Sequence, residues 1–393
     1  MKRINITLFA LMLLAILFSC TRANLNYTQN GNWVGRATFA GVAMGSGAGF
    51  VIGNSAYVGT GINPLTPNSK LTAMFKYTAA TIPNGTSEPY GYDSAYGSWT
   101  NAATCPGQPR SNAIGFTIGS TGYMGSGLAN DNFTSLSDFY SYDAGANAWT
   151  PIDSIPDGTG TYSGRYDAAA FSFQSVGYVL TGKTQYYYLK DVWKYDPSVG
   201  HWSQQVYFPG STRSGASTFN YNNFGYIVAG YTPGSKWASG NYCYDFWKFD
   251  PTQTDSTLIW KRLRDVFNTN SGTYDDGYTN IIRTNAVAFT ILGQPDGDKG
   301  YITLGSTNNS DVTFTWEYDF LSDLWTEKTP YEGTGRTGAF GFSIVSGTSS
   351  GTISNGTYGK SRGFVATGLN QGSSAAFSDC EEFFPNQVYN QFD

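Results

Sequence analysis

Arginine is the residue of this chain whose repetition first suggests a chemical role. Six arginines each stand six residues before a Phe or Val, and each motif continues into a short apolar run that ends in glycine. A planar guanidinium binds carboxylates through two parallel hydrogen bonds, so such a set could hold an acidic ligand. Alternatively, each arginine caps a loop or pairs with a neighbouring repeat. The arginines are Arg36, Arg110, Arg165, Arg213, Arg283 and Arg336, and the residues six places on are Val42, Phe116, Phe171, Phe219, Phe289 and Phe342.

A single carboxylate interrupts this regularity. Asp167 follows Arg165 by two residues and therefore lies on the same face of an extended strand. A lone carboxylate beside an arginine could act as a general base, and it could equally be an internal ion-pair partner. The sequence leaves both interpretations open. The corresponding positions of the other repeats hold Thr38, Asn112, Gly215, Asn285 and Gly338.

The single histidine, His201, limits the metal chemistry that this chain can perform. A histidine-ligated copper or zinc centre uses two or three such ligands, and no repeat places a serine and an acid around His201 for a catalytic triad. We therefore expect no metal ion and no cofactor. The repeated aspartates precede a strand, where a short carboxylate accepts hydrogen bonds from a turn backbone, and we expect them to be structural. They are Asp138, Asp191, Asp245 and Asp379.

Three further motifs accompany the arginines and complete the repeat. An aromatic run closes on glycine, an Asp-x-aromatic-x-aromatic segment follows, and a lone tryptophan comes last. Four short strands, recurring about every 60 residues, are typical of the blades of a β-propeller. The sequence predicts one all-β domain over residues 31–393, a six-bladed propeller with four antiparallel strands per blade. Because the last repeat lacks its tryptophan, we expect the N-terminal strand with Trp33 to close the ring and leave no unpaired edge.

These motifs resemble the kelch repeat, whose pattern runs through an arginine, an aromatic strand ending in glycine, a tyrosine strand and a tryptophan. The resemblance covers residues 31–385 and implies that the arginines ring the mouth of a central channel, where related domains grip acidic peptides or ligand carboxylates. Kelch strands usually end in two glycines, and here the first is replaced in every repeat. The replacements are Thr60, Ser126, Thr181, Ala229, Leu304 and Thr367.

Aromatic residues outside the repeat positions gather in the loops expected on one face of the propeller. Aromatic clusters of this kind stack on carbohydrates or anchor protein partners, and loop aromatics also pack against one another. We expect Trp237, Tyr187 and Tyr278 to join Asp167 and the arginines as binding residues. The whole set comprises Tyr186, Tyr187, Tyr188, Tyr207, Phe208, Trp237, Tyr274 and Tyr278.

The N-terminus has the order of an export signal. Lys2 and Arg3 precede an apolar run, and the segment 17–20 that follows resembles a bacterial lipobox ending at Cys20. We expect a signal peptide over residues 1–19, acylation of the Cys20 thiol and a linker over residues 20–30. Removal of the signal leaves 21 basic and 28 acidic residues, a net charge of −7, which argues against nucleic acid as a partner. The expected location is the bacterial cell envelope, at the outer membrane, with the lipid as the only membrane contact.

Together these features predict a lipid-anchored scaffold without catalytic activity, whose partner is a protein or a glycan bound on the arginine and aromatic face. One alternative is an enzyme: kelch-type bacterial proteins include a sialic acid mutarotase, and Arg165, Asp167 and Arg213 would be its first candidates. A second alternative is a structural subunit of a larger envelope complex. Fold class does not decide among these.

Overall fold

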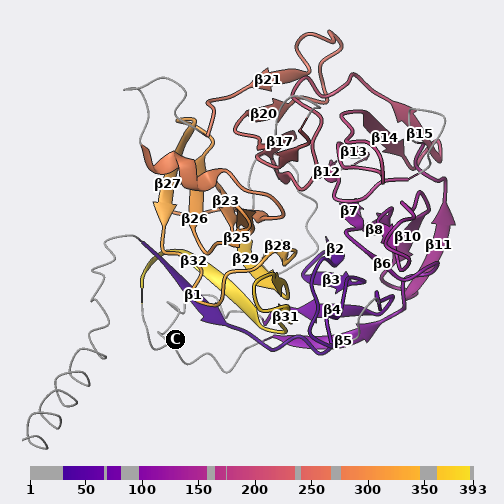
Figure 1. The fold of residues 1–393 in the computed structure, drawn as a ribbon, viewed down its shortest axis with the longest axis horizontal. Coiled ribbons are helices and arrows are strands. Elements are labelled where there is room, and N and C mark those ends of the chain that lie inside the picture. The colour runs from indigo at the N-terminus through magenta and orange to yellow at the C-terminus, as the bar shows by residue number, and fades with distance from the viewer. Residues whose placement is uncertain are drawn as a thin grey trace, which may run out of the picture.

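The chain forms a ring of six four-stranded antiparallel sheets (Figure 1). The computed structural model describes residues 30–65, 69–80, 97–156, 164–173, 175–234, 240–266, 276–345 and 361–389. A short 3₁₀ helix, η1 (Asp276–Ile281), is the only helical element among these residues, and none of them forms a helix long and apolar enough to span a membrane. The prediction of a six-bladed propeller is confirmed.

Each blade runs from an innermost strand at the central axis to an outermost strand at the rim. Blade 1 holds β2 (Ala48–Ile52), β3 (Ser55–Gly59), β4 (Met74–Thr78) and β5 (Ser98–Ala102), and blade 2 holds β7 (Ile114–Ile118), β8 (Thr121–Gly125), β10 (Phe139–Asp143) and β11 (Ala148–Ile152). Blade 3 holds β12 (Ala169–Ser172), β13 (Gly177–Leu180), β14 (Val192–Asp196) and β15 (His201–Gln204), and blade 4 holds β16 (Ser217–Tyr221), β17 (Phe224–Val228), β20 (Phe246–Phe249) and β21 (Trp260–Arg262). Blade 5 holds β22 (Val287–Ile291), β23 (Lys299–Thr303), β26 (Thr315–Asp319) and β27 (Leu324–Lys328), and blade 6 holds β28 (Phe340–Val345), β29 (Ser361–Ala366), β32 (Cys380–Val388) and β1 (Asn30–Gly35).

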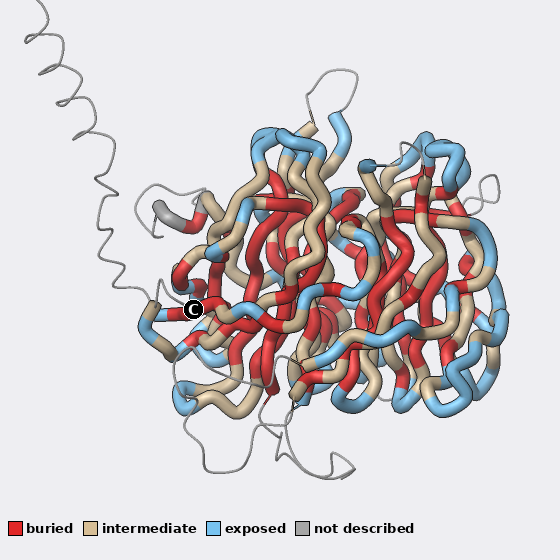
Figure 2. Tube along the Cα trace, turned by 90° about the horizontal axis from the view of Figure 1, so that it is seen from below, coloured by how far each residue is buried: buried red, intermediate tan, exposed pale blue. Residues whose placement is uncertain are grey.

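The loops lie at the two ends of the strands, so the ring has two faces, and Figure 2 shows the buried strands between these exposed layers. We call one the loop face: it carries the connections that enter each first strand and those between the second and third strands. Four two-stranded ribbons lie in these connections. They are β6 (Arg110–Ser111) with β9 (Leu128–Ala129), β18 (Tyr231–Thr232) with β19 (Asn241–Tyr242), β24 (Ser306–Thr307) with β25 (Ser310–Asp311), and β30 (Leu369–Asn370) with β31 (Ala375–Ala376).

The N-terminal strand closes the ring, as the sequence predicted. β1 pairs antiparallel with β32, and Trp33 stands opposite Phe383. The Trp33 ring is buried and packs 4.6 Å from Phe383 of blade 6 and 6.5 Å from Phe289 of blade 5, measured between ring centroids. Strand β1 therefore completes blade 6 and also ties it to its neighbour.

Adjacent blades interlock through the phenylalanine of each first strand. In five of the six cases its ring lies over a glycine of the second strand in the next blade, where a Cβ would come within 2.2 Å of Phe50 at Gly122 and within 2.3 Å of Phe116 at Gly177; blade 1 has Ala56 at this position. At these glycines a side chain would fit only if the phenylalanine ring moved. This close approach explains why the repeat places glycine before its strand-two aromatic.

The structure corrects the first repeat. The residue four places before the first strand, which is arginine in the other five blades, is Met44 in blade 1. Met44 O accepts the Gly368 N–H at 2.8 Å, as Arg165 O accepts the Gly127 N–H at 2.7 Å. Arg36 instead follows β1, and it resembled a repeat arginine because it stands three residues after Trp33 and six before an apolar residue, Val42. By the same shift, Phe50 rather than the exposed Val42 is the interlocking residue and Ser46 rather than Thr38 corresponds to Asp167.

The six residues that replace the first kelch glycine all adopt the left-handed backbone region that glycine favours, with φ between 57° and 64°. The conformation is thus kept while the side chain varies.

Candidate functional site

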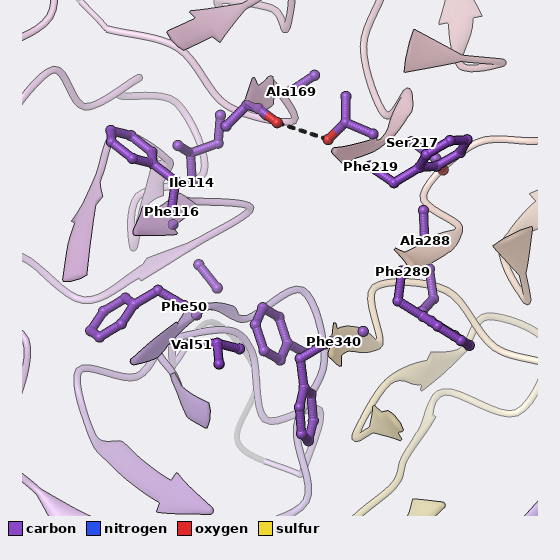
Figure 3. Close-up of a pocket in the computed structure, with 18 of the residues that line it drawn as sticks. Phe50, Val51, Ile114, Phe116, Ala169, Ser217, Phe219, Ala288, Phe289 and Phe340 are labelled. Carbon is purple, nitrogen blue, oxygen red and sulfur yellow. Dashed lines mark hydrogen bonds between the residues drawn. The ribbon is translucent and has the colours of Figure 1, made fainter. Parts of the chain in front are cut away.

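The central channel forms a cavity with a volume of about 580 Å³. The first strands of the six blades line it, and Figure 3 shows the rings of Phe50, Phe116 and Phe219 turned away from the open centre. Small and hydroxyl side chains are left facing the space, because alternate residues of a strand point to opposite sides. One of them, Thr218, donates its hydroxyl to the Ala170 carbonyl of blade 3 at 3.0 Å.

A closed circle of backbone hydrogen bonds surrounds the channel at the loop face. One residue per blade contributes, two positions before each first strand, and all six have left-handed φ angles between 50° and 62°. This circle fixes the diameter of the channel mouth. Ser46 N donates to Gly338 O (2.7 Å), Asn112 N to Ser46 O (2.7 Å), Asp167 N to Asn112 O (3.1 Å), Gly215 N to Asp167 O (2.9 Å), Asn285 N to Gly215 O (2.9 Å) and Gly338 N to Asn285 O (3.3 Å).

Asp167 is the acidic member of this circle, and it forms an ion pair. Lys183 Nζ lies 3.1 Å from Asp167 Oδ2, while Asn112 donates its side-chain amide to Asp167 Oδ1. The side chains retain 9% exposure at Asp167 and 24% at Lys183, so the pair is sheltered but accessible. Burial lowers the pKa of Lys183, yet the Asp167 carboxylate and the rings of Tyr188 and Tyr166 outweigh burial and leave that pKa raised. Lys183 is accordingly a stable cation beside the channel.

Tyrosines extend from this ion pair across the loop face of blades 3 and 4. Lys183 Nζ lies 5.0 Å from the ring centroid of Tyr166 and 5.7 Å from that of Tyr188. The Tyr188 ring is 6.4 Å from that of Tyr231, which is 5.5 Å from Tyr242. Two further rings, 60% and 54% exposed, complete a group that we call the tyrosine strip. Its members are Tyr186, Tyr187, Tyr188, Tyr231 and Tyr242.

Four repeat arginines are buried inside their own blades and point away from the channel mouth. Arg165 forms two hydrogen bonds to Asp191, at 2.8 and 2.7 Å, and a third to the Thr181 carbonyl. The other three repeat this arrangement, each with the aspartate that precedes its third strand. Those aspartates are structural, as predicted, but their partner is a guanidinium rather than a turn backbone. The pairs are Arg110–Asp138, Arg165–Asp191, Arg213–Asp245 and Arg336–Asp379.

The two remaining arginines differ from these four. Arg283 is fully buried and donates to the backbone carbonyls of Leu304 and Phe314, at 2.9 and 2.8 Å, because Phe314 stands where other blades have aspartate. Burial lowers the pKa of Arg283 to about 9. Arg36 pairs with Glu382 at 2.7 Å beside the closing strand.

Other residues considered from the sequence are found away from the channel mouth or outside the described residues. Tyr278 is buried and accepts the Trp325 N–H at 3.0 Å, so it holds η1 against blade 5. His201 is exposed and lies 3.1 Å from Asp153. Trp237 and Cys20 lie outside the described residues. No group of three or more His, Cys, Asp or Glu in the described part of the chain could hold a metal ion, and the three cysteines there are unpaired and buried: Cys105, Cys243 and Cys380.

Sequence reasoning missed Lys183, although a signal was present. Lys183 follows the glycine that ends the second strand, a position held elsewhere by uncharged residues. Its bridge partner Tyr166 is likewise the only aromatic at its position. Aligning the repeats at these loop positions would have shown two exceptions in the same blade as Asp167. The uncharged residues are Ile62, Leu128, Tyr231, Ser306 and Leu369.

Comparison with known proteins shows the fold. A solved structure described as "Structure of YjhT" superposes with a TM-score of 0.61 at 17% identity, over 88% of this chain and 95% of that one. At this identity the likeness extends to the fold alone. No protein-family model matches the chain, and no curated protein sequence does. The chain is thus a six-bladed β-propeller whose kelch relationship remains a prediction.

Proposed function

We propose that this protein is a non-catalytic binding scaffold of the bacterial cell envelope, anchored by a lipid on Cys20, whose blades are divergent kelch repeats. Its partner, a protein or a glycan, docks on the loop face of blades 3 and 4. The observation that carries this proposal is the tyrosine strip, in which Tyr186 and Tyr187 are exposed and Tyr188 contacts Lys183 of the ion pair at the channel mouth. Exposed aromatic rings beside convergent polar groups are typical of binding sites.

We expect the partner to contact tyrosine side chains rather than the repeat arginines. The guanidinium groups of Arg165 and Arg213 are fully buried and already paired, so a ligand would have to break an internal ion pair to reach them. Tyr186 and Tyr187 need no such rearrangement, because their rings are exposed.

The test is a matched pair of variants on equivalent loops. The double variant Tyr186→Ser/Tyr187→Ser removes the exposed rings of blade 3, and Phe133→Ser removes a ring that is 62% exposed on the corresponding loop of blade 2. Partners captured from detergent-solubilised envelopes should fall at least tenfold with the double variant and stay unchanged with the control. Equal capture by all three proteins contradicts the proposal.

A second candidate function is a sugar mutarotase, which the Asp167–Lys183 pair favours. For such a step, Asp167 would accept the proton of an anomeric hydroxyl while Lys183 protonates the ring oxygen, so that the ring C–O bond breaks and a carbonyl forms; closure reverses these transfers. Asp167, the proton acceptor, and Lys183, the proton donor, lie 3.1 Å apart beside the channel. Asp167→Asn should abolish accelerated anomer exchange, measured by NMR on glucose and N-acetylneuraminate. No acceleration by the unmodified protein rules this candidate out.

A further inference from the structure

We propose that the channel mouth beside blades 3 and 4 binds an uncharged carbohydrate, with a sugar ring stacked on the tyrosine strip and its hydroxyls directed to Asp167, Lys183 and Asn112. This inference rests on the binding function proposed above and names the chemical class of the ligand.

The polar groups at the mouth suit a polyhydroxyl ligand. A carboxylate accepts hydrogen bonds, an ammonium donates them, and amide side chains do both, whereas each sugar hydroxyl donates one and accepts two. Asp167, Lys183, Asn112 and Asn285 place these three types together at one end of the channel, and all four retain some exposure. The cavity of about 580 Å³ behind them falls within the range of small-molecule sites.

The charge balance selects an uncharged ligand. Asp167 is the only charged residue among the described residues that line the channel. The ammonium of Lys183 lies 3.1 Å from its carboxylate and balances its charge. A carboxylate on the ligand would meet the Asp167 carboxylate. A cation would compete with Lys183 for its partner. Neither charge gains a counter-ion without separating a sheltered pair, which costs more than an exposed pair would.

The tyrosine strip supplies the other half of sugar recognition. Aromatic rings pack against the flat C–H face of a sugar ring and keep their hydroxyls available for hydrogen bonds. Tyr188 contacts both Lys183 and Tyr231, so it connects the polar mouth to the stacking surface. A saccharide longer than one unit could therefore place one ring at the mouth and the next over Tyr187, which is 54% exposed.

The chain itself offers variants that should fold. Asp167 has a left-handed φ of 50°, and the corresponding residues Asn112 and Asn285 adopt 54° and 51°, so Asp167→Asn suits the backbone. The double variant Asp167→Asn/Lys183→Leu reproduces the Asn112 and Leu128 found in blade 2. Melting temperatures should stay close to that of the wild type in both.

The experiment is calorimetric titration of the mature protein with neutral hexasaccharides of glucose, mannose, galactose and xylose, and with a hexamer of galacturonic acid. The wild type should bind at least one neutral probe ten times more tightly than the acidic one. Asp167→Asn leaves the Lys183 cation without its counter-ion and should improve binding of the acidic probe at least tenfold. The double variant should lose that gain, and Tyr186→Ser/Tyr187→Ser should weaken the neutral probe tenfold.

Absence of binding by every neutral probe at millimolar concentration overturns the inference, as does a wild type that prefers the galacturonate hexamer. If no sugar binds while capture of an envelope protein still depends on the tyrosines, the ligand class is wrong and the proposed scaffold function stands. Sugar binding that is indifferent to the tyrosine and Asp167 variants places the glycan elsewhere and refutes this site.

Discussion

Arg165 and Arg283 occupy the same position in different blades, yet they have different partners. Arg165 faces the nearly buried carboxylate of Asp191, whereas Arg283 faces only carbonyl oxygens. Blade 1 lacks both charges, with Met44 in place of the arginine and Ala73 in place of the aspartate. Loss of the arginine is thus accompanied by loss of its carboxylate, which is the pattern expected of a structural ion pair.

This comparison predicts unequal costs for the same substitution. Arg165→Met should lower the free energy of unfolding by about 3 to 5 kcal/mol, because it strands the Asp191 carboxylate in the interior. Arg283→Met should cost clearly less, since it removes a desolvated cation and strands no charge. The midpoint of urea unfolding measures both, and Arg165→Met/Asp191→Ala, which imitates blade 1, should regain part of the loss. Equal midpoints for the two single variants would refute this interpretation.

Glu381 predicts a pH dependence of stability. Burial raises the pKa of Glu381 to about 7, and the neighbouring Asp379 carboxylate adds to that shift, while the Tyr331 hydroxyl and Arg336 oppose it. Between the ordinary glutamate pKa and 7, the folded protein holds a proton that the unfolded chain has released. Glu381 therefore stabilises the fold at acidic pH, and this contribution, on the order of 3 kcal/mol, is lost as pH rises to 7. Glu381→Gln should flatten the difference between unfolding curves at pH 5 and pH 7.5; an unchanged difference would show that Glu381 does not titrate in this range.

Among the secondary-structure elements, the six-residue strand β1 has a large effect on the stability of the ring, because it is the fourth strand of blade 6. The sequence revealed this arrangement because tryptophan marks the outermost strand and one repeat lacked it. The same reliance on motif spacing misplaced the first repeat at Arg36, which directly follows the closing strand and imitates the repeat arginine. Only strand pairing distinguishes Met44 from Arg36.

Deletion of β1 should therefore destabilise the whole ring. A chain lacking residues 21–34 should melt well below a control that lacks only residues 21–29, because the first deletion exposes an edge of β32 and the second leaves β1 intact. Trp33→Ala should cost about 3 to 5 kcal/mol, the usual scale for truncating a buried aromatic. Identical melting of the two deletions would contradict ring closure by this strand.

For the molecule as a whole, the repeated motif made the propeller predictable. The candidate site, in contrast, consists of residues that occur in only one repeat. Glycine, aromatic and tryptophan positions recur because every blade packs on its neighbours in the same way. Asp167, Lys183 and Tyr166 recur nowhere, and what joins them is loop pairing between residues 17 apart, which periodicity does not report. The sequence therefore identified Asp167 as the exception near the channel but missed the lysine that neutralises it.

The proposed lipid anchor can be tested separately from the propeller. Cys20→Ala should release the protein from membranes without changing its melting temperature, because Cys20 precedes β1 by ten residues. Labelled palmitate should be incorporated into the wild type alone. Equal labelling of both proteins would refute acylation at this cysteine.

The pairing of β1 with β32 also sets the order in which this molecule can be completed. These strands lie about 350 residues apart, so β1 must wait, unpaired, during synthesis until the last blade has followed it. Closing so long a loop carries an entropic cost that the interlocked blades must first reduce by holding the two ends near each other. Until then, both Trp33 and the edge of β32 are exposed together, and the late steps of assembly are when this chain most needs protection from pairing with another copy of itself.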